Sequence, residues 1–303
     1  ARMATGDARY SLVCYEDGGI VDDVFVYRLP DRYFIAVNAA NTDKDALWFR
    51  YQLGSFQASV ENISDDTYML ALQGPQAQDI LQQLTPAQLD KLSHHRATEN
   101  KVAGVPALIA RTGYTGEDGF ELFFPRQKAM LLWDRIVEVG EPLGLKPIGL
   151  AARDSLRFEA KMPLYGQEIG PNINPLQAGL GWAVSFNKGD FVGRNTLLKV
   201  KLEGSSSELV GLEMVDRGVP RHGYPVAVDG HAVGEVTSGM FAPTLGRYLA
   251  LAYLPVAQAG LGAEVQVIVR GSPKKAKVVP TPFYTPAYRR SRHNSGGSKH
   301  GKS

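Results

Sequence analysis

Two adjacent acids at the start of an apolar strand pattern are the first candidates for chemistry. Asp22 and Asp23 follow the Gly18-Gly19 pair and precede Val24-Phe-Val-Tyr27. Because neighbouring strand residues point to opposite faces, one of these carboxylates must face inward or into a cleft. A hairpin turn that uses Gly and Asp in the ordinary way also accounts for the segment, so both interpretations stay open.

An acid within a run of aromatic residues is the second candidate. Glu121 lies between Phe120 and Leu122, after a loop with three glycines at positions 113, 116 and 119. An ionised carboxylate in apolar surroundings is costly unless donors pair with it. Either an internal Arg or a ligand with two adjacent N–H groups satisfies this requirement. The loop lacks the Lys-Ser/Thr of a nucleotide P-loop, so we exclude a phosphate cradle.

Two arginines spaced four residues apart are the third candidate. A helix is expected over 150–160, and Arg153 and Arg157 share one of its faces. They can hold the carboxylates of a ligand, or they can bridge Asp154 and Glu159 within the protein. Exposed ion pairing of this kind is the commoner outcome.

Other types of site lack their usual sequence patterns. We find no zinc-ligand spacing, Gly-x-Ser-x-Gly elbow or Rossmann fingerprint, so no metal is expected. One cysteine, Cys14, excludes an internal disulfide framework and fits a reducing compartment. The sequence shows neither a membrane-spanning run nor a signal peptide, so we expect a cytoplasmic protein, or a mitochondrial-matrix protein in a eukaryote.

The elements that must position these residues are mixed along the first two thirds of the chain. Gly-Pro at 74–75 opens a helix whose apolar residues recur at helical spacing up to Leu84, and a second helix follows Pro125 and stops at Gly140. A further helical pattern follows Gly193. Apolar runs rich in β-branched and aromatic residues predict strands over 24–29, 33–37, 68–72, 107–110 and 120–124.

The texture changes after the flexible stretch Glu203–Ser207. Five short strands, over 209–215, 224–228, 231–237, 248–254 and 263–269, predict a small β-barrel or sandwich. We therefore expect an α+β chain with a two-lobed region at 1–204, a barrel domain at 205–285 and a disordered basic tail at 286–303. The net charge is +2, and the tail supplies five basic residues and no acid, so the rest of the chain carries −3 and is a poor nucleic-acid binder.

Several of these motifs occur together and in order. They are Gly18-Gly-Ile-Val-Asp-Asp23, Val37-Asn-Ala-Ala-Asn41, Leu72-Gln-Gly-Pro-Gln-Ala-Gln78, Arg111-Thr-Gly-Tyr-Thr-Gly-Glu-Asp-Gly-Phe-Glu121, Ala152-Arg-Asp154, Leu164-Tyr-Gly-Gln167, Gly234-Glu-Val-Thr-Ser-Gly239 and Pro243-Thr-Leu-Gly246. Their order and spacing closely resemble the T protein of the glycine cleavage system, a folate-dependent aminomethyltransferase. The resemblance runs along nearly the whole chain, to about Tyr284.

The resemblance implies a fold and a reaction. The fold is multi-lobed, with tetrahydrofolate bound as co-substrate in a central hole and with a β-barrel as the last lobe. In the reaction, the aminomethyl group on the lipoyl arm of the H protein is taken up, ammonia is released and 5,10-methylenetetrahydrofolate is formed. The implied partners are therefore tetrahydrofolate and the lipoylated H protein, with no nucleic acid and no membrane.

The resemblance also assigns roles to residues. Asp23 matches the catalytic carboxylate, which we place near folate N5, where it takes up a proton or stabilises the developing iminium. Glu121 matches the residue that holds the pterin, whose edge offers adjacent N–H donors, and Arg153 matches a folate-site arginine. Side chains placed to line the pocket are Tyr10, Tyr27, Asn38 and Tyr114.

Three alternatives remain at this stage. A folate-dependent demethylase of the same superfamily shares the pterin pocket. A non-catalytic folate-binding accessory protein is a second option, although Lys161-Met-Pro-Leu-Tyr-Gly-Gln-Glu168 lacks the cysteine of that class. Family members also carry an N-terminal segment before the equivalent of Ala1, and its absence would remove a pocket wall and leave an inactive chain.

Overall fold

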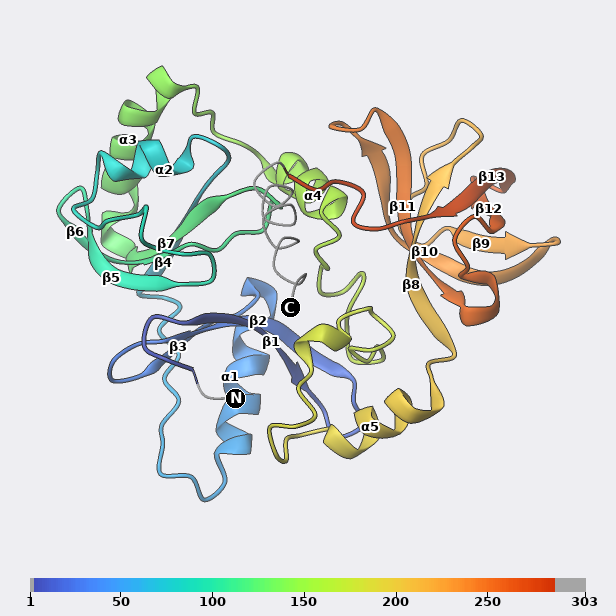
Figure 1. Ribbon diagram of the computed structural model, residues 1–303, viewed down its shortest axis with the longest axis horizontal. Helices are drawn as coiled ribbons and strands as arrows, with labels where there is room; N and C mark the ends of the chain where they lie inside the picture. The colour runs from blue at the N-terminus through green and yellow to red at the C-terminus, as the bar shows by residue number, and fades with distance from the viewer. Residues whose placement is uncertain (1–2, 287–303) are drawn as a thin grey trace, which may run out of the picture. The chain divides into compact units, whose positions relative to one another are not determined.

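The computed structural model describes residues 3–286, which form two compact units (Figure 1). The unit we call the barrel unit comprises residues 11–23 and 151–285. The unit we call the two-sheet unit comprises the described residues up to Tyr10 together with residues 24–150. Apart from Pro286, the expected basic tail lies outside the described residues.

The described strands outside the barrel form two antiparallel sheets. The four-stranded sheet lies within the two-sheet unit, and the three-stranded sheet has residues in both units. The three-stranded sheet has the order β1-β2-β3, and its strands are β1 (Ala8–Cys14), β2 (Ile20–Arg28) and β3 (Tyr33–Ala36). The four-stranded sheet has the order β4-β7-β6-β5, and its strands are β4 (Thr67–Gln73), β5 (Ala97–Val102), β6 (Val105–Ala110) and β7 (Gly119–Pro125). The helices of this unit are α1 (Thr42–Leu53), α2 (Ala77–Gln82) and α3 (Ala129–Gly140).

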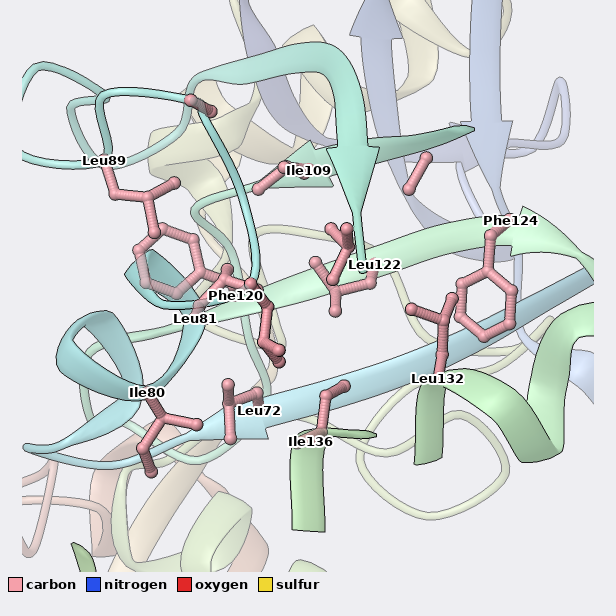
Figure 2. Close-up of a cluster of buried hydrophobic side chains, with 14 of the residues drawn as sticks. Leu72, Ile80, Leu81, Leu89, Ile109, Phe120, Leu122, Phe124, Leu132 and Ile136 are labelled. Atoms are coloured by element: carbon pink, nitrogen blue, oxygen red, sulfur yellow. The ribbon is translucent and has the colours of Figure 1, made fainter. Parts of the chain in front are cut away.

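Both faces of the four-stranded sheet are covered. On one face, Phe120, Leu122 and Phe124 of β7 pack with residues of α2 and α3 (Figure 2). On the other face, Phe123 packs with Tyr27 and neighbouring residues of the first sheet. Because successive strand residues alternate between faces, Glu121 lies on the same face as Phe123 and not in the core drawn in Figure 2.

The barrel unit is built on a closed barrel with the strand order β10-β11-β8-β13-β12-β9 (Figure 1). Its strands are β8 (Ser207–Met214), β9 (Pro225–Val228), β10 (His231–Ala242), β11 (Arg247–Pro255), β12 (Glu264–Val269) and β13 (Ser272–Val279). The sequence predicted five of these strands and missed β13, which pairs with both β8 and β12. Closure of the barrel depends on this sixth strand, because it joins two strands that would otherwise be edges.

Two longer helices accompany the barrel, α4 (Leu150–Glu159) and α5 (Arg194–Glu203). Phe158 of α4 is fully buried against Leu249 and Leu251 of the barrel wall. The helix ends in a Schellman motif, since Met162 N donates to Arg157 O at 2.8 Å and Lys161 N donates to Phe158 O at 2.9 Å. This motif turns the chain sharply into the loop that follows α4.

Short 3-10 helices complete the described structure: η1 (Ala39–Asn41), η2 (Arg126–Lys128), η3 (Glu141–Leu143), η4 (Gly181–Ala183) and η5 (Val256–Gln258). Within residues 3–286, no helix combines the length and the apolar character that a membrane crossing requires.

Candidate functional site

The acid pair lies near the start of strand β2. Asp22 has no exposed surface, whereas its neighbour Asp23 is partly exposed. The prediction that one carboxylate faces inward is therefore confirmed, and it is Asp22 that is buried. Asp23 is the member of the pair that solvent or a ligand can reach.

The hairpin before β2 fixes where this acid pair begins. Tyr15 N donates to Gly19 O at 2.9 Å, and Gly18 N donates to Tyr15 O at 3.0 Å. Gly18 has a φ of +85°, the left-handed value that a three-residue hairpin loop requires at this position. A Cβ at Gly19 would lie 1.9 Å from the carbonyl oxygen of Pro171, so a glycine is required for this close approach. The turn thus brings two backbone segments that are distant in sequence into contact.

Glu121 is held by two hydroxyl groups. Thr112 Oγ1 donates to Glu121 Oε2, and the hydroxyl of Tyr27 lies 3.4 Å from the same oxygen and 3.2 Å from Thr112 Oγ1. Burial, and next the charge of Glu121, raise the pKa of Tyr27 well above its ordinary value, so this hydroxyl keeps its proton. Donors thus meet the acid in its aromatic surroundings, but these two are hydroxyl groups of the protein, a kind of partner that the sequence did not predict.

The glycine-rich loop before Glu121 is fastened from β4. Gln73 Nε2 donates to the carbonyl oxygens of Thr112 at 3.1 Å and Phe120 at 3.2 Å, and Thr115 Oγ1 donates to Gln73 Oε1 at 3.2 Å. One amide side chain therefore holds both ends of the loop. This arrangement sets the position from which Thr112 reaches Glu121.

Arg111 makes a second set of contacts that holds this loop. Arg111 Nε and Nη2 donate to the two carboxylate oxygens of Asp118 at 3.0 and 2.5 Å, and Arg111 Nη1 donates to Leu89 O and Leu92 O at 3.0 Å each. Burial raises the pKa of Asp118, but the hydrogen bonds and charge of Arg111 outweigh it and lower the pKa below 3.8. Asp118 is therefore an ionised structural partner of Arg111.

The two arginines of α4 have different surroundings. Arg153 is exposed, whereas Arg157 is fully buried. Arg157 donates to Asp154 at 2.8 Å, which confirms one of the two expected bridges. Glu159, the other expected partner, accepts Thr244 N at 3.0 Å through its Oε1.

The predicted pocket residues divide between the two units. Asp23 and Arg153 belong to the barrel unit, and Glu121 belongs to the two-sheet unit. The side chains predicted to line the pocket, all in the two-sheet unit, are Tyr10, Tyr27, Asn38 and Tyr114. Of these, Tyr27 has no exposed surface and contacts Glu121 from within the protein, whereas the other three are partly exposed. The structure brings Tyr27 and Glu121 together.

Some residues of this site were not identified from the sequence. Thr112 and Gln73 stand in the quoted motifs, but nothing in their type marks them as partners of Glu121. Thr112 precedes Gly113 in an ordinary loop sequence, and its role follows only from the pairing of β6 with β7. Among residues 3–286, no group of three or more His, Cys, Asp or Glu side chains is arranged to hold a metal ion.

Comparison with known proteins shows similarity along most of the chain. The model of the GCVT N-terminal domain matches residues 1–188, and the model of the glycine cleavage T-protein C-terminal barrel domain matches residues 208–285. An aminomethyltransferase from Symbiobacterium thermophilum is 51% identical over 298 residues, which cover 96% of this chain and 80% of that protein. One from Caldanaerobacter subterraneus subsp. tengcongensis is 46% identical over 292 residues, covering 96% of this chain and 78% of that protein.

A solved structure shows the same similarity in three dimensions. The glycine cleavage system aminomethyltransferase T from Bartonella henselae superposes with a TM-score of 0.87 at 34% sequence identity. The match covers 94% of this chain and 78% of that one.

Proposed function

Because this chain belongs to the glycine cleavage T-protein family of aminomethyltransferases, we propose that it transfers the aminomethyl-derived one-carbon unit from a lipoylated H protein to tetrahydrofolate. Ammonia is released, and 5,10-methylenetetrahydrofolate is the product. The observation that carries the proposal is the match of both family domains, over residues 1–188 and 208–285, within which Glu121 has donors that orient its carboxylate.

In this proposal Glu121 holds the pterin ring. A pterin edge presents an amino group and a ring N–H side by side, and a carboxylate accepts two such donors in parallel. The hydroxyls of Thr112 and Tyr27 both reach Oε2, so they fix the rotation of the carboxylate before any ligand arrives. A carboxylate that is already oriented loses less entropy on binding than a mobile one does.

Asp23 is the proposed catalytic carboxylate. Its partial exposure on β2 distinguishes it from the buried Asp22, and a carboxylate beside folate N5 can accept a proton or stabilise the positive charge of the iminium as ammonia leaves. Arg153 is exposed at the first turn of α4, where its guanidinium can bind a carboxylate of the folate. Tyr10, Asn38 and Tyr114 complete the proposed pocket with partly exposed side chains.

The test is release of ammonia by the purified chain when it is mixed with aminomethylated, lipoylated H protein and tetrahydrofolate. We expect ammonia and methylenetetrahydrofolate in equal amounts, and a large loss of turnover for Asp23→Asn. Reactions without tetrahydrofolate or with H protein that lacks the lipoyl group are the controls. Transfer of a methyl group from sarcosine or dimethylglycine to tetrahydrofolate, giving 5-methyltetrahydrofolate and the demethylated amine with no reaction of the H protein, would instead identify a demethylase.

A further inference from the structure

A loop in the barrel unit connects a buried ion pair to the strand that carries the proposed catalytic acid. We propose that Arg157, Glu168 and Tyr165 are positioning residues for the transfer reaction, which act through the loop 162–173 to fix the place of Asp23. This inference rests on the proposed function in one respect, the catalytic role of Asp23. The contacts themselves all lie within the barrel unit.

The loop 162–173 is held to the barrel strands by Glu168, which has no exposed surface. Glu168 Oε1 accepts the hydroxyl of Thr237 at 2.7 Å, and Oε2 accepts Leu164 N at 3.0 Å. The hydroxyl of Tyr253 donates to the backbone oxygen of Glu168 at 2.7 Å. Side chain and backbone of one residue are thus both tied to the barrel, since Thr237 and Tyr253 belong to β10 and β11.

Arg157 neutralises this buried carboxylate and ties α4 to the same point. Its Nη1 donates to Glu168 Oε2 at 2.7 Å, and its Nη2 donates to Ser238 Oγ at 2.9 Å and to Gln167 Oε1 at 3.1 Å. Nε donates to Asp154 at 2.8 Å. A buried ion pair is stable only when its remaining donors and acceptors are satisfied, and this pair meets that condition.

The same loop also holds the start of β2, through contacts with Ile20. The hydroxyl of Tyr165 donates to Ile20 O at 3.2 Å. Ile20 N in turn is shared between Gly170 O and Ile173 O, each at 3.1 Å. Both polar groups of the Ile20 backbone are therefore bound by the loop, three residues before Asp23 on the same strand.

Backbone hydrogen bonds within the loop connect the residue that contacts the barrel with those that contact β2. Gly166 N donates to Ile169 O at 2.8 Å, and Gln167 N donates to Leu164 O at 3.0 Å. Tyr165 and Glu168 therefore belong to one hydrogen-bonded turn, so a displacement of Glu168 also moves Tyr165 and, through its hydroxyl, Ile20. A carboxylate misplaced by about 1 Å is enough to lower a reaction rate by about 100-fold.

The inference explains why an ion pair is retained in the interior of the barrel unit. A pair of this kind contributes little net stability compared with apolar residues of the same volume, but its directional hydrogen bonds fix geometry more tightly than apolar contacts do. Here four segments meet at the pair: α4, the loop 162–173, β10 and β11.

The first experiment compares Tyr165→Phe with Tyr248→Phe in the full chain. Tyr248 lies on β11 with its ring 5.2 Å from that of Phe241, so its substitution makes the same chemical change away from the loop. We expect kcat to fall about fivefold for Tyr165→Phe, with KM for tetrahydrofolate unchanged and the melting temperature lowered by about 2–4 °C, and no effect for Tyr248→Phe. Equal kcat values for Tyr165→Phe and the wild type would overturn the proposal.

A readout that is independent of catalysis separates this proposal from the proposed function. Amide hydrogen exchange over residues 20–23 should accelerate in Tyr165→Phe, and exchange over β11 should not. If the wild-type chain releases no ammonia, the proposed function fails, yet the exchange result still decides whether Tyr165 holds Ile20. Unchanged exchange over residues 20–23 contradicts the inference.

The ion pair is tested with Arg157→Lys and Arg157→Met. Lysine keeps the charge beside Glu168 but makes fewer directional bonds, whereas methionine leaves the carboxylate uncompensated. We expect kcat to fall about tenfold for Arg157→Lys and about 100-fold for Arg157→Met when the two are compared at temperatures where both remain folded. A kcat loss that only follows the loss of folded protein, with no rescue by lysine, overturns the positioning role.

Discussion

Substitution of Gly19 by alanine is the sharpest single perturbation of the contact between the hairpin and the loop 162–173. The added Cβ would lie 1.9 Å from Pro171 O, and ordinary van der Waals contacts begin at 3.4 Å. The two backbone segments must therefore separate by about 1.5 Å, the difference between these distances. Gly170→Ala is the matched control, because a Cβ there has no heavy atom within 4 Å and its φ is not in the left-handed region.

The size of the effect follows from the bonds that such a separation breaks. Ile20 N loses its acceptors Gly170 O and Ile173 O, both at 3.1 Å, and Ile20 O loses the hydroxyl of Tyr165 at 3.2 Å. The N–H of Ile20 is one donor shared between two acceptors, so together with the Tyr165 hydroxyl two hydrogen-bond donors lose their partners; at about 1 kcal/mol each, this amounts to about 2 kcal/mol of stability. Asp23, three residues along the strand, moves with Ile20, and we expect kcat to fall about 100-fold.

The assay combines ammonia release with urea unfolding of both glycine variants. We expect Gly19→Ala to lose kcat and about 2 kcal/mol of unfolding free energy, and Gly170→Ala to retain both within experimental error. Wild-type kcat and stability in Gly19→Ala would refute the reasoning, since they would mean that the close approach to Pro171 does not constrain β2.

Three further predictions concern other parts of the chain. Thr112→Val should weaken tetrahydrofolate binding about tenfold in titration calorimetry and Thr112→Ser should restore it, because only a hydroxyl orients Glu121; equal affinities for the two variants contradict this role. Arg270→Asn should raise the free energy of unfolding by about 0.5–1 kcal/mol, because Arg270 has a φ of +50° in a two-residue hairpin with Gly271 and asparagine tolerates that conformation better; an unchanged urea midpoint contradicts it. The pKa of Asp118 is lowered in the folded state, so its contribution to stability is present above pH 3.8 and is lost as the pH falls through that lowered pKa. Asp118→Asn should therefore lower the free energy of unfolding at pH 7 and make it fall less steeply as the pH decreases. An acid dependence equal to that of the wild type contradicts this prediction.

The sequence predicted those elements whose side chains carry a clear period. Strands β2, β4 and β7 and helices α3 and α4 lie within a few residues of their expected ranges, and β7 and α3 show the clearest reason, because each buries a row of apolar side chains. Strands β5 and β13 were missed for a physical reason. In β5 the four residues 98–101 are all polar or charged, and β13 contains three lysines. Both strands are stabilised by pairing with their neighbours more than by their own sequence.

The same distinction applies to the site. The sequence identified Glu121 because a carboxylate among aromatic residues needs donors, and the structure supplies them. It gave no indication that these donors are Thr112 and Tyr27, since the Tyr27 contact spans 94 residues of sequence and both contacts depend on how β2, β6 and β7 are placed. The sequence analysis did not predict helix α1. Only Asp45 and Ala46 among its residues are buried, so the helix has no buried apolar face that a sequence pattern could indicate.

Arg157 illustrates how helical spacing alone misleads. Four residues separate it from Arg153, so the two share a face of α4 in projection, yet one is exposed and the other fully buried. The end of the helix packs against the barrel through Phe158, whereas residues 150, 151 and 153 at its beginning are exposed. The burial of a helical face therefore depends on where along the helix its packing partner lies.

Titration calorimetry with tetrahydrofolate tests the central claim, that Glu121 holds the pterin while Asp23 serves the reacting nitrogen. We predict that Glu121→Ala abolishes binding and that Asp23→Asn binds tetrahydrofolate with nearly the wild-type affinity although its turnover is reduced. Wild-type affinity in Glu121→Ala would contradict the assignment of the pocket.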